Sequence, residues 1–359
     1  MSVLTVIMLV FSVIGALDRI FGCRLGIGKE YERAFMLLGP MALSMIGMIV
    51  ISPLIADVMR PVSEFTYEVL HIDASIIPAS LFANDMGGAS LSVDMAKDLD
   101  IGLYNALVVS SMMGCTVSFT IPFALGVVGK EQHRELLLGL LCGIITIPAG
   151  CLVAGFICAI SFVELIVNLI PLIVFSIVLA IGVVKLPDLS VKIFKVVGFL
   201  ITALITVGLT LGVIEALLKT ELIPVLAPIE EGGLVCLNAA IVLSGAFPLV
   251  NVVSRLLARP LRFVGAKIGI NEISVVGMVS ALASSATSFG VMNRMDKRGT
   301  TLNAAFSVSG AFILGSHLAF TMAFNPDYVL PVIVGKLVSG VLAVVLAYFV
   351  YSKSEDREG

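Results

Sequence analysis

The chain has 359 residues, of which 59% are hydrophobic and 13% are charged, and its mean hydropathy is +1.11. Soluble domains carry about 25% charged residues, so this composition excludes a soluble globular protein and predicts an all-α protein that crosses a membrane several times. The net charge of −3, the absence of a basic tract and the absence of Trp give no sign of nucleic-acid binding.

Nine stretches of the chain are long and apolar enough to form a membrane helix, which needs about 20 apolar residues. They are 2–22, 33–57, 101–128, 134–160, 161–185, 192–218, 233–257, 300–324 and 327–352. No basic region precedes the first stretch, so we interpret it as a membrane helix and not as a cleaved signal peptide.

Two further apolar segments, 74–97 and 273–297, are interrupted in the middle, and short amphipathic pieces near 60–71 and 260–271 precede them. The first interruption contains the run Asn-Asp-Met-Gly-Gly, whose glycines let the backbone leave helical geometry. The second interruption is polar but uncharged. A broken helix persists at membrane depth only where protein or a water-filled cavity surrounds it, so both breaks are candidate binding sites.

The basic residues of the loops indicate how these two segments are arranged. If both segments crossed the membrane, Lys and Arg would divide evenly between the two sides. If both enter and return on the same side, nearly all loop Lys and Arg lie on one side, as the positive-inside rule requires. We therefore expect two re-entrant hairpins that reach about 15 Å into the bilayer. The N-terminus then lies on the outer side of the cytoplasmic membrane, and the C-terminus lies on its inner side.

The chain also repeats itself. Its only two Arg-Pro pairs, Arg60-Pro61 and Arg259-Pro260, lie 199 residues apart, and the order of elements around them agrees. The predicted parts are a first repeat at 1–160 with its hairpin at 74–97, a linker helix at 161–191, a second repeat at 192–352 with its hairpin at 273–297, and a cytoplasmic tail at 353–359. The odd number of crossings before the second repeat makes the repeats inverted, which is typical of secondary transporters with a midplane binding site.

Asp85, in the first interruption, is the strongest candidate for substrate binding. A carboxylate near the bilayer centre costs about 3 kcal/mol on insertion scales, so it should pair with a substrate cation, a proton or a sodium ion. The alternative is that Asp85 caps the second half-helix of the hairpin.

The other candidate substrate-binding residues are polar side chains that this arrangement brings near the two breaks: Asn84, Ser284, Ser285, Thr287, Ser288, Asn303, Asn105, Ser111 and His317. The hydroxyls could equally satisfy the broken backbone, and the asparagines could bond across helices. His317 is either a packing residue or a proton relay. Lys336 needs a carboxylate partner, and we interpret it as a structural ion pair with Asp85 or Glu215.

Five of the six cysteines lie in apolar runs and no Cys-x-x-Cys occurs, so we expect no metal site, no disulfide framework and no cofactor. The sequence also contains no His-Glu-x-x-His and no Gly-x-Ser-x-Gly, which argues against an intramembrane enzyme.

Four short motifs occur in a characteristic order: Asn-Asp-Met-Gly-Gly at 84–88, Ser-Met-Met-Gly at 111–114, Met-Asp-Lys-Arg-Gly at 295–299 and Val-Gly-Lys-Leu at 334–337. With them the chain resembles, over nearly its whole length, the ethanolamine permease family of bacterial ethanolamine-utilisation operons (EutH). The resemblance implies uptake of ethanolamine across the cytoplasmic membrane for cleavage to acetaldehyde and ammonia.

Ethanolamine is mostly a cation at neutral pH and carries one hydroxyl. Asp85 could pair with its ammonium, while the Ser284–Ser288 tip or Asn303 reads its hydroxyl. An ion-coupled transporter of another small metabolite, such as a carboxylate or a nucleoside, and a passive channel are the alternatives. The sequence leaves open sodium or proton coupling and whether the chain forms a homo-oligomer.

Overall fold

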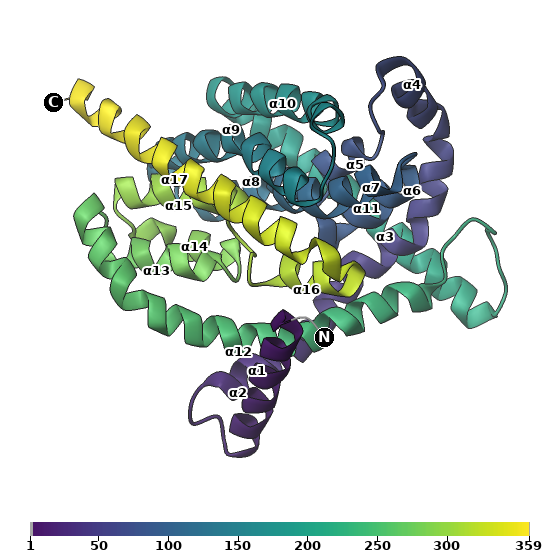
Figure 1. Ribbon diagram of the computed structural model, residues 1–359, viewed down its shortest axis with the longest axis horizontal. Helices are drawn as coiled ribbons and strands as arrows, with labels where there is room; N and C mark the ends of the chain where they lie inside the picture. Colours follow the sequence, from purple (N-terminus) through teal and green to yellow (C-terminus); the bar gives the residue numbers. More distant parts are fainter. Residues whose placement is uncertain (1–2, 359) are drawn as a thin grey trace.

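The computed structural model describes residues 3–358, which form helices and turns without any strand (Figure 1). In the first half of the chain the helices are α1 (Val3–Ile20), α2 (Ile27–Met36), α3 (Leu38–Val58), α4 (Arg60–Leu70), α5 (Ile76–Leu81), α6 (Gly88–Met95), α7 (Leu99–Tyr104), α8 (Ile121–Val127) and α9 (His133–Ile157). In the second half they are α10 (Phe162–Lys185), α11 (Pro187–Leu218), α12 (Ile229–Ile268), α13 (Glu272–Ala281), α14 (Ser285–Val291), α15 (Lys297–Ser309), α16 (Ser316–Phe324) and α17 (Val329–Glu358).

Within residues 3–358, seven helical segments are long and apolar enough to cross a bilayer. They are Ile27–Val58, Leu99–Val127, Lys130–Ile157, Phe162–Val183, Val196–Leu218, Ile229–Leu256 and Pro326–Lys353. These segments coincide with seven of the nine predicted helices. Of the other two, α1 has 18 residues and is shorter than any of the seven, and the predicted helix 300–324 is interrupted.

The prediction of one continuous helix over 300–324 is wrong, because α15 ends at Ser309 and α16 begins at Ser316. Main-chain hydrogen bonding explains the interruption. The amide of Phe312 donates to the carbonyl of Ala281 (3.0 Å), and the amide of Leu314 donates to that of Leu282 (2.9 Å). Residues 310–315 therefore leave the helix to pair with the break between α13 and α14.

One smaller expectation also needs correction. The amphipathic piece at 260–271 is not separate, since α12 continues through Pro260 to Ile268 as one helix of 40 residues. Helix α17 also continues through the predicted tail as far as Glu358, and the cytoplasmic location of that tail stays a prediction.

Each of the two interrupted segments folds back on itself, because its ends are tied together. In the first segment the Asp73 carboxylate accepts hydrogen bonds from the amides of Lys97 (2.9 Å) and Asp98 (3.0 Å). In the second segment the Asp296 carboxylate accepts from the amide of Asn271 (2.8 Å). The pair α5–α6 lies towards the α4 side of the molecule, and α13–α14 lies on the opposite side (Figure 1). How these hairpins sit in a bilayer stays a prediction.

One contact recurs in both halves of the chain. The side-chain amide of Asn105 donates to the hydroxyl of Ser75 (2.8 Å), and that of Asn303 donates to the carbonyl of Ser274 (2.9 Å). In each half, the helix that follows the hairpin therefore holds the first arm of the hairpin through an asparagine.

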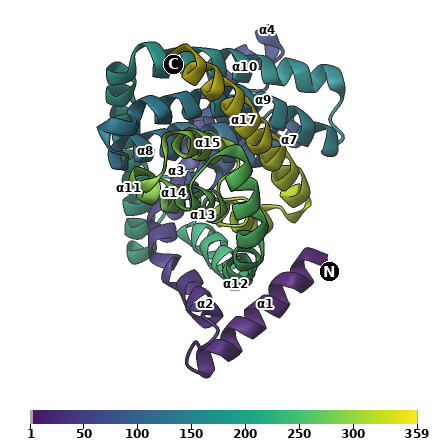
Figure 2. The ribbon, with the colours of Figure 1, turned by 90° about the vertical axis from the view of Figure 1, so that its left-hand side faces the viewer.

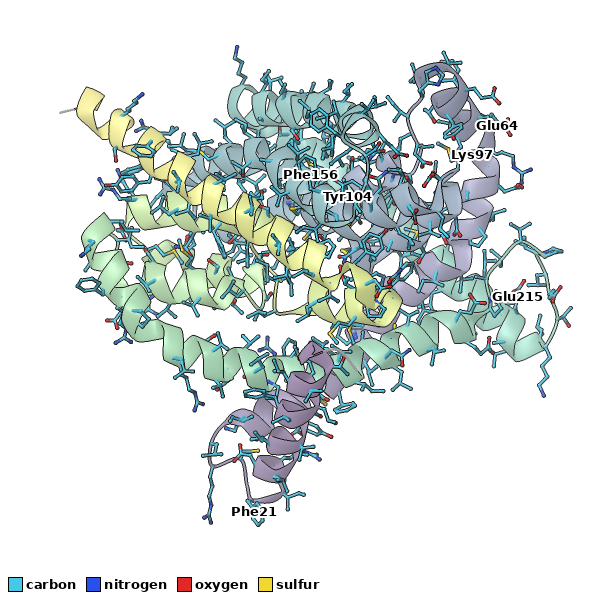
Figure 3. All side chains as sticks on the ribbon, viewed as in Figure 1. Phe21, Glu64, Lys97, Tyr104, Phe156 and Glu215 are labelled. Carbon is cyan, nitrogen blue, oxygen red and sulfur yellow. The ribbon has the colours of Figure 1, made fainter. Side chains whose placement is uncertain are left out.

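The outer surface suits a lipid environment. The α1–α2 pair projects from the rest of the molecule and exposes apolar side chains of α1 (Figure 2). Charged side chains such as Glu64, Lys97 and Glu215 come from different elements and lie along one end of the molecule (Figure 3). Apolar flanks and a charged end are expected of a protein that crosses a bilayer.

Candidate substrate-binding site

The first hairpin breaks because its residues 82–87 leave the helical conformation. Phe82 and Ala83 are extended, one 3₁₀ turn carries Asp85, and Gly87 then takes a positive φ of 92° before α6 begins. That conformation favours glycine, and a Cβ at Gly87 would lie 1.7 Å from the Cγ of Met48. The local sequence therefore places Asp85 at the tip of the hairpin.

Two serine hydroxyls satisfy the backbone groups that this break leaves free. Ser110 donates to the carbonyl of Phe82 (2.6 Å), and Ser118 accepts from the amide of Ala83 (3.1 Å). Both serines belong to the stretch between α7 and α8, which winds as π-helix over Asn105–Gly114 and Thr116–Thr120. π-Helical turns are rare and occur frequently at functional sites.

The second hairpin breaks at Leu282–Ser284, and main-chain groups of residues 310–315 satisfy it. This pairing requires a close approach, since a Cβ at Gly315 would lie 2.1 Å from the carbonyl oxygen of Ala283. Phe312 adopts a positive φ of 62° there, a conformation that a bulky residue keeps only when its surroundings hold it.

A cavity of about 370 Å³ lies between the two breaks. Its polar lining includes Asp85 on the first tip, Ser284 on the second tip, and Ser316 and His317 at the start of α16. Arg33 of α2 and Ser44 of α3 complete it. Its apolar lining includes the rings of Phe119, Phe247 and Phe312. A mostly apolar cavity with a few convergent polar groups is the usual form of a small-molecule site.

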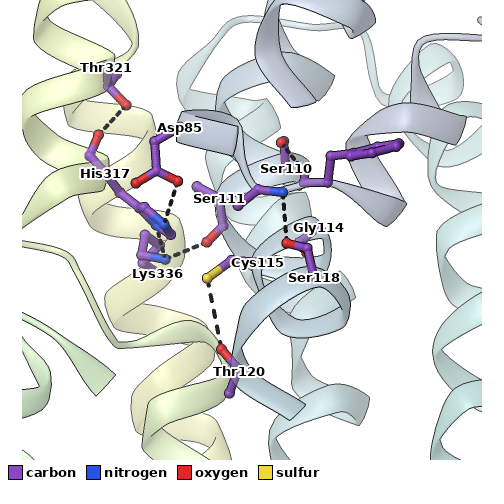
Figure 4. Close-up of polar contacts among 12 residues, drawn as sticks. Asp85, Ser110, Ser111, Gly114, Cys115, Ser118, Thr120, His317, Thr321 and Lys336 are labelled. Atoms are coloured by element: carbon purple, nitrogen blue, oxygen red, sulfur yellow. Dashed lines mark hydrogen bonds and ion pairs between the residues drawn. The ribbon is translucent and has the colours of Figure 1, made fainter. Parts of the chain in front are cut away.

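Asp85 begins a chain of three ionisable groups (Figure 4). Its Oδ1 lies 3.8 Å from Nε2 of His317, whose Nδ1 lies 3.2 Å from Nζ of Lys336. Nζ also donates to the carbonyl of Ser111 (2.7 Å). Because an ammonium only donates, we assign a neutral imidazole that accepts at Nδ1 and carries its proton on Nε2, towards Asp85.

The ion pair expected for Lys336 is therefore indirect, because the imidazole of His317 stands between the ammonium and Asp85. Glu215 is not the partner, since its carboxylate accepts from the amides of Leu222 and Ile223 just beyond the end of α11. The side chain of Asp85 remains 20% exposed and faces the cavity, whereas that of His317 is buried.

The structure brings three of the predicted binding residues, Asp85, Ser284 and His317, to this cavity. Asn84 and Ser285 are buried beside the tips and outside the cavity lining, and within the described residues their side-chain polar atoms have no hydrogen-bond partner.

The remaining predicted residues make structural contacts. Ser288 donates to the side-chain oxygen of Asn303 (3.1 Å), and Asn105 exchanges hydrogen bonds with Asn168. The hydroxyl of Ser111 bonds within its own helix. Thr287 bonds to backbone carbonyls of its own hairpin and lines a neighbouring cavity.

Sequence reasoning missed Ser316 and the aromatic wall of the cavity. Ser316 lines the cavity together with Asp85, and Phe312 stacks on the His317 ring with 4.8 Å between ring centroids. Knowledge that the helix is interrupted before Ser316 was the missing signal. Without it, Ser316 and Phe312 are two positions of an apolar helix.

The neighbouring cavity has a volume of about 350 Å³ and adjoins the site. The two cavities share Arg33, Phe247 and Ala283 as lining residues. Arg33 lies over the Phe247 ring, 5.0 Å from its centroid, and pairs with Glu30. These side chains therefore lie at the boundary between the two cavities.

Comparison with known proteins gives the family of the chain. The model of the family described as "Ethanolamine utilisation protein, EutH" matches residues 1–350. A Listeria monocytogenes protein named "Probable ethanolamine permease EutH" is 39% identical over 352 residues, which cover 98% of this chain and 94% of the relative. A Salmonella typhimurium protein of the same name is 36% identical over 395 residues, covering 99% and 97%. A Bacillus subtilis relative, 34% identical over 341 residues covering 95% and 92%, is named "Uncharacterized protein YxeR".

No solved structure matches the chain. The family model and the curated relatives extend over nearly its whole length and confirm the resemblance seen in its motifs. The chain belongs to the EutH family of ethanolamine utilisation proteins.

Proposed function

We propose that the protein is a permease that takes up ethanolamine across the bacterial cytoplasmic membrane and binds the ammonium of its substrate at Asp85. The names of the curated relatives and the seven apolar spans support a transporter of this kind. The observation that carries the proposal is the Asp85 carboxylate, which faces a largely apolar cavity without a salt-bridge partner closer than 3.8 Å within the described residues.

The cavity has the two poles that ethanolamine needs. The ammonium donates to Asp85 through a charge-assisted hydrogen bond, the stronger kind. The hydroxyl exchanges hydrogen bonds with Ser284 of the opposite tip, while the two methylenes lie against the Phe312 ring. The side-chain amide of Asn303 is already hydrogen-bonded to Ser274 and Ser288, so it does not bond the hydroxyl of the substrate.

The transport path uses the two hairpins from opposite membrane faces. Their tied ends, the asparagine contact that recurs in both halves and the distribution of loop Lys and Arg support two inverted repeats with the N-terminus outside. Alternating access then opens the cavity to one face at a time. The neighbouring cavity beyond Arg33 forms one of the two exits.

Labelled ethanolamine uptake by proteoliposomes tests the proposal. The Asp85→Asn variant should lose about 100-fold in uptake, since a neutral amide replaces the only acceptor with a full charge in the cavity wall. The matched control is Asp57→Asn, which removes an exposed carboxylate paired with Arg60 and should leave uptake unchanged.

A competition panel addresses specificity. Ethanolamine should compete far better than ethylamine, because a site that bonds a hydroxyl rejects an analogue without it. Better competition by a carboxylate or a nucleoside would favour another metabolite as substrate. Uptake that neither saturates nor shows counterflow would indicate a passive channel.

A further inference from the structure

Lys336 is the largest feature of the site that ethanolamine binding does not use. Its side chain is buried, with 1% of the residue exposed, in the first third of the long apolar helix α17. Its ammonium contacts a backbone carbonyl of Ser111 and the neutral ring of His317. A buried charge is costly unless it is compensated, so the site must gain something from keeping it.

Every titratable group that faces this ammonium or the cavity within the described residues can be named. They are Asp85 on the first hairpin, His317 on α16, Cys115 on the π-helical stretch, Cys151 on α9, and Arg33 on α2 at the cavity edge. Arg33 has its own partner in Glu30. The imidazole accepts from the Lys336 ammonium and is therefore assigned as neutral, and burial disfavours the charged form of a thiol. Asp85 and Lys336 therefore balance each other, and the empty site holds no net charge.

A bound ammonium disturbs this balance by adding one positive charge. In an enclosed site of low dielectric constant, charges interact far more strongly than in water. Of the cations nearby, the Arg33 guanidinium cannot lose a proton, whereas a buried lysine can. Lys336 also has a way to release it, because His317 connects Nζ to the cavity through its two ring nitrogens.

Resting on the proposed function, we propose that Lys336 gives up one proton when an ammonium binds at Asp85, so that the protein exchanges one substrate cation for one proton. One N–H bond of Lys336 breaks, one forms at Nδ1 of His317, and the proton on Nε2 passes to water in the cavity. When the amine leaves, the same relay returns a proton to Lys336. The site carries no net charge in either state, so a transport cycle moves no net charge across the membrane.

Titration calorimetry on the full-length protein in detergent tests this exchange. Ethanolamine hydrochloride is titrated at pH 7 in two buffers with different ionisation enthalpies, and the difference in heat gives the protons released. Wild type should release about one proton per amine bound, and its affinity should rise about tenfold per pH unit, since binding that releases a proton is favoured at higher pH.

Two variants separate a proton of the protein from a proton of the substrate. Lys336→Met keeps an unbranched apolar stem and has no proton to release at this position, so any release in this variant comes from Asp85, which has lost its compensating cation, or from the amine. Lys336→Arg keeps a cation beside Ser111 and should release none, with weaker binding. Release that persists in Lys336→Arg, where Asp85 keeps a cation nearby, would mean that the neutral amine binds, and would overturn the proposal.

Wild type alone can also overturn it. Amine binding without proton release, binding that requires sodium, or a sustained transport current on a solid-supported membrane would each exclude electroneutral proton exchange. Absence of any amine binding or uptake by wild type is a different result, because it contradicts the proposed function itself.

Discussion

The two broken hairpins face the same physical problem and solve it differently. In the first hairpin, the free backbone groups of Phe82 and Ala83 bond to the hydroxyls of Ser110 and Ser118. The helical stretch that supplies these hydroxyls remains unbroken. Side chains thus satisfy this break at no cost to the continuity of the neighbouring helix.

In the second hairpin, main-chain groups satisfy the free backbone groups of the break. The amides of Phe312 and Leu314 bond to the hairpin, and to do so they must leave their own helix. The second interruption creates a new helix start at Ser316. That start contacts the turn carrying Asp85 on the first hairpin, and helix N-termini favour negative charge. The difference between the hairpins is therefore what brings Ser316 and His317 into the lining of the cavity beside Asp85.

The largest effect that sharpens this comparison is expected at two glycines. A Cβ at Gly114 would lie 1.9 Å from the carbonyl oxygen of Phe82, and one at Gly315 would lie 2.1 Å from that of Ala283. Alanine at either position should cost about 3 kcal/mol, because backbone must move. Thermal unfolding in detergent measures this.

Gly126→Ala and Gly290→Ala are the controls, since nothing lies within 4 Å of a Cβ at either position. Both should unfold like wild type. A Gly114→Ala variant as stable as these controls would show that the first tip does not pack as described.

The next largest effect concerns the side chains that satisfy each break. Ser110→Ala leaves the carbonyl of Phe82 without its partner and should cost about 2 kcal/mol. Thr287→Val in the second hairpin should change stability by less than about 0.5 kcal/mol, because its hydroxyl is exposed. Chemical unfolding of the two variants checks the contrast, and equal losses would contradict it.

A smaller effect is expected on substrate selectivity. Ser284→Ala should lower the preference for ethanolamine over ethylamine by about tenfold, because it removes the hydroxyl partner on the second tip. Ser285→Ala is the matched control, since Ser285 is buried outside the cavity lining. The ratio of the inhibition constants of ethanolamine and ethylamine in uptake assays gives the preference. A shift of this ratio in Ser285→Ala but not in Ser284→Ala would show that Ser285, and not Ser284, bonds the substrate hydroxyl.

The smallest effect is expected where the ends of the hairpins are tied. Asp73→Asn and Asp296→Asn each keep one acceptor oxygen but lose the charge, and should each cost about 1 kcal/mol. Hydrogen exchange of the amides of Lys97 and Asn271 should accelerate about fivefold in the respective variant. Unchanged exchange in one of them would show that its hairpin is held by packing alone.

The sequence was sufficient for features that have a local signal. Apolar length indicates the spans, and paired glycines beside a carboxylate indicate the tip of the first hairpin. It was insufficient for the interruption at 310–315, whose residues Gly-Ala-Phe-Ile-Leu-Gly are as apolar as a helix. That break exists because a distant backbone requires hydrogen bonds, and no pattern within the segment reports such a requirement.

The candidate site likewise has one part that the sequence predicts and another part that it does not. The place of Asp85 at a helix break could be predicted because a carboxylate in an apolar segment is anomalous wherever it lies, and its role in binding stays a proposal. The relation of Asp85 to His317 and Lys336 could not, because it depends on which faces of three distant segments meet. Asn105 and Asn303 show the converse, since a buried amide that braces two helices is indistinguishable in sequence from one that binds a ligand.

The main-chain pairing at the second tip has a consequence for how this protein can diversify. Hydrogen bonds between Ala281 or Leu282 and residues 312–314 involve backbone atoms only, so they do not depend on which side chains stand nearby. Ser284 and Ser316 can therefore be substituted without breaking the main-chain hydrogen bonds that position them. A library restricted to these two positions should yield permeases with altered amine preference on an unaltered scaffold.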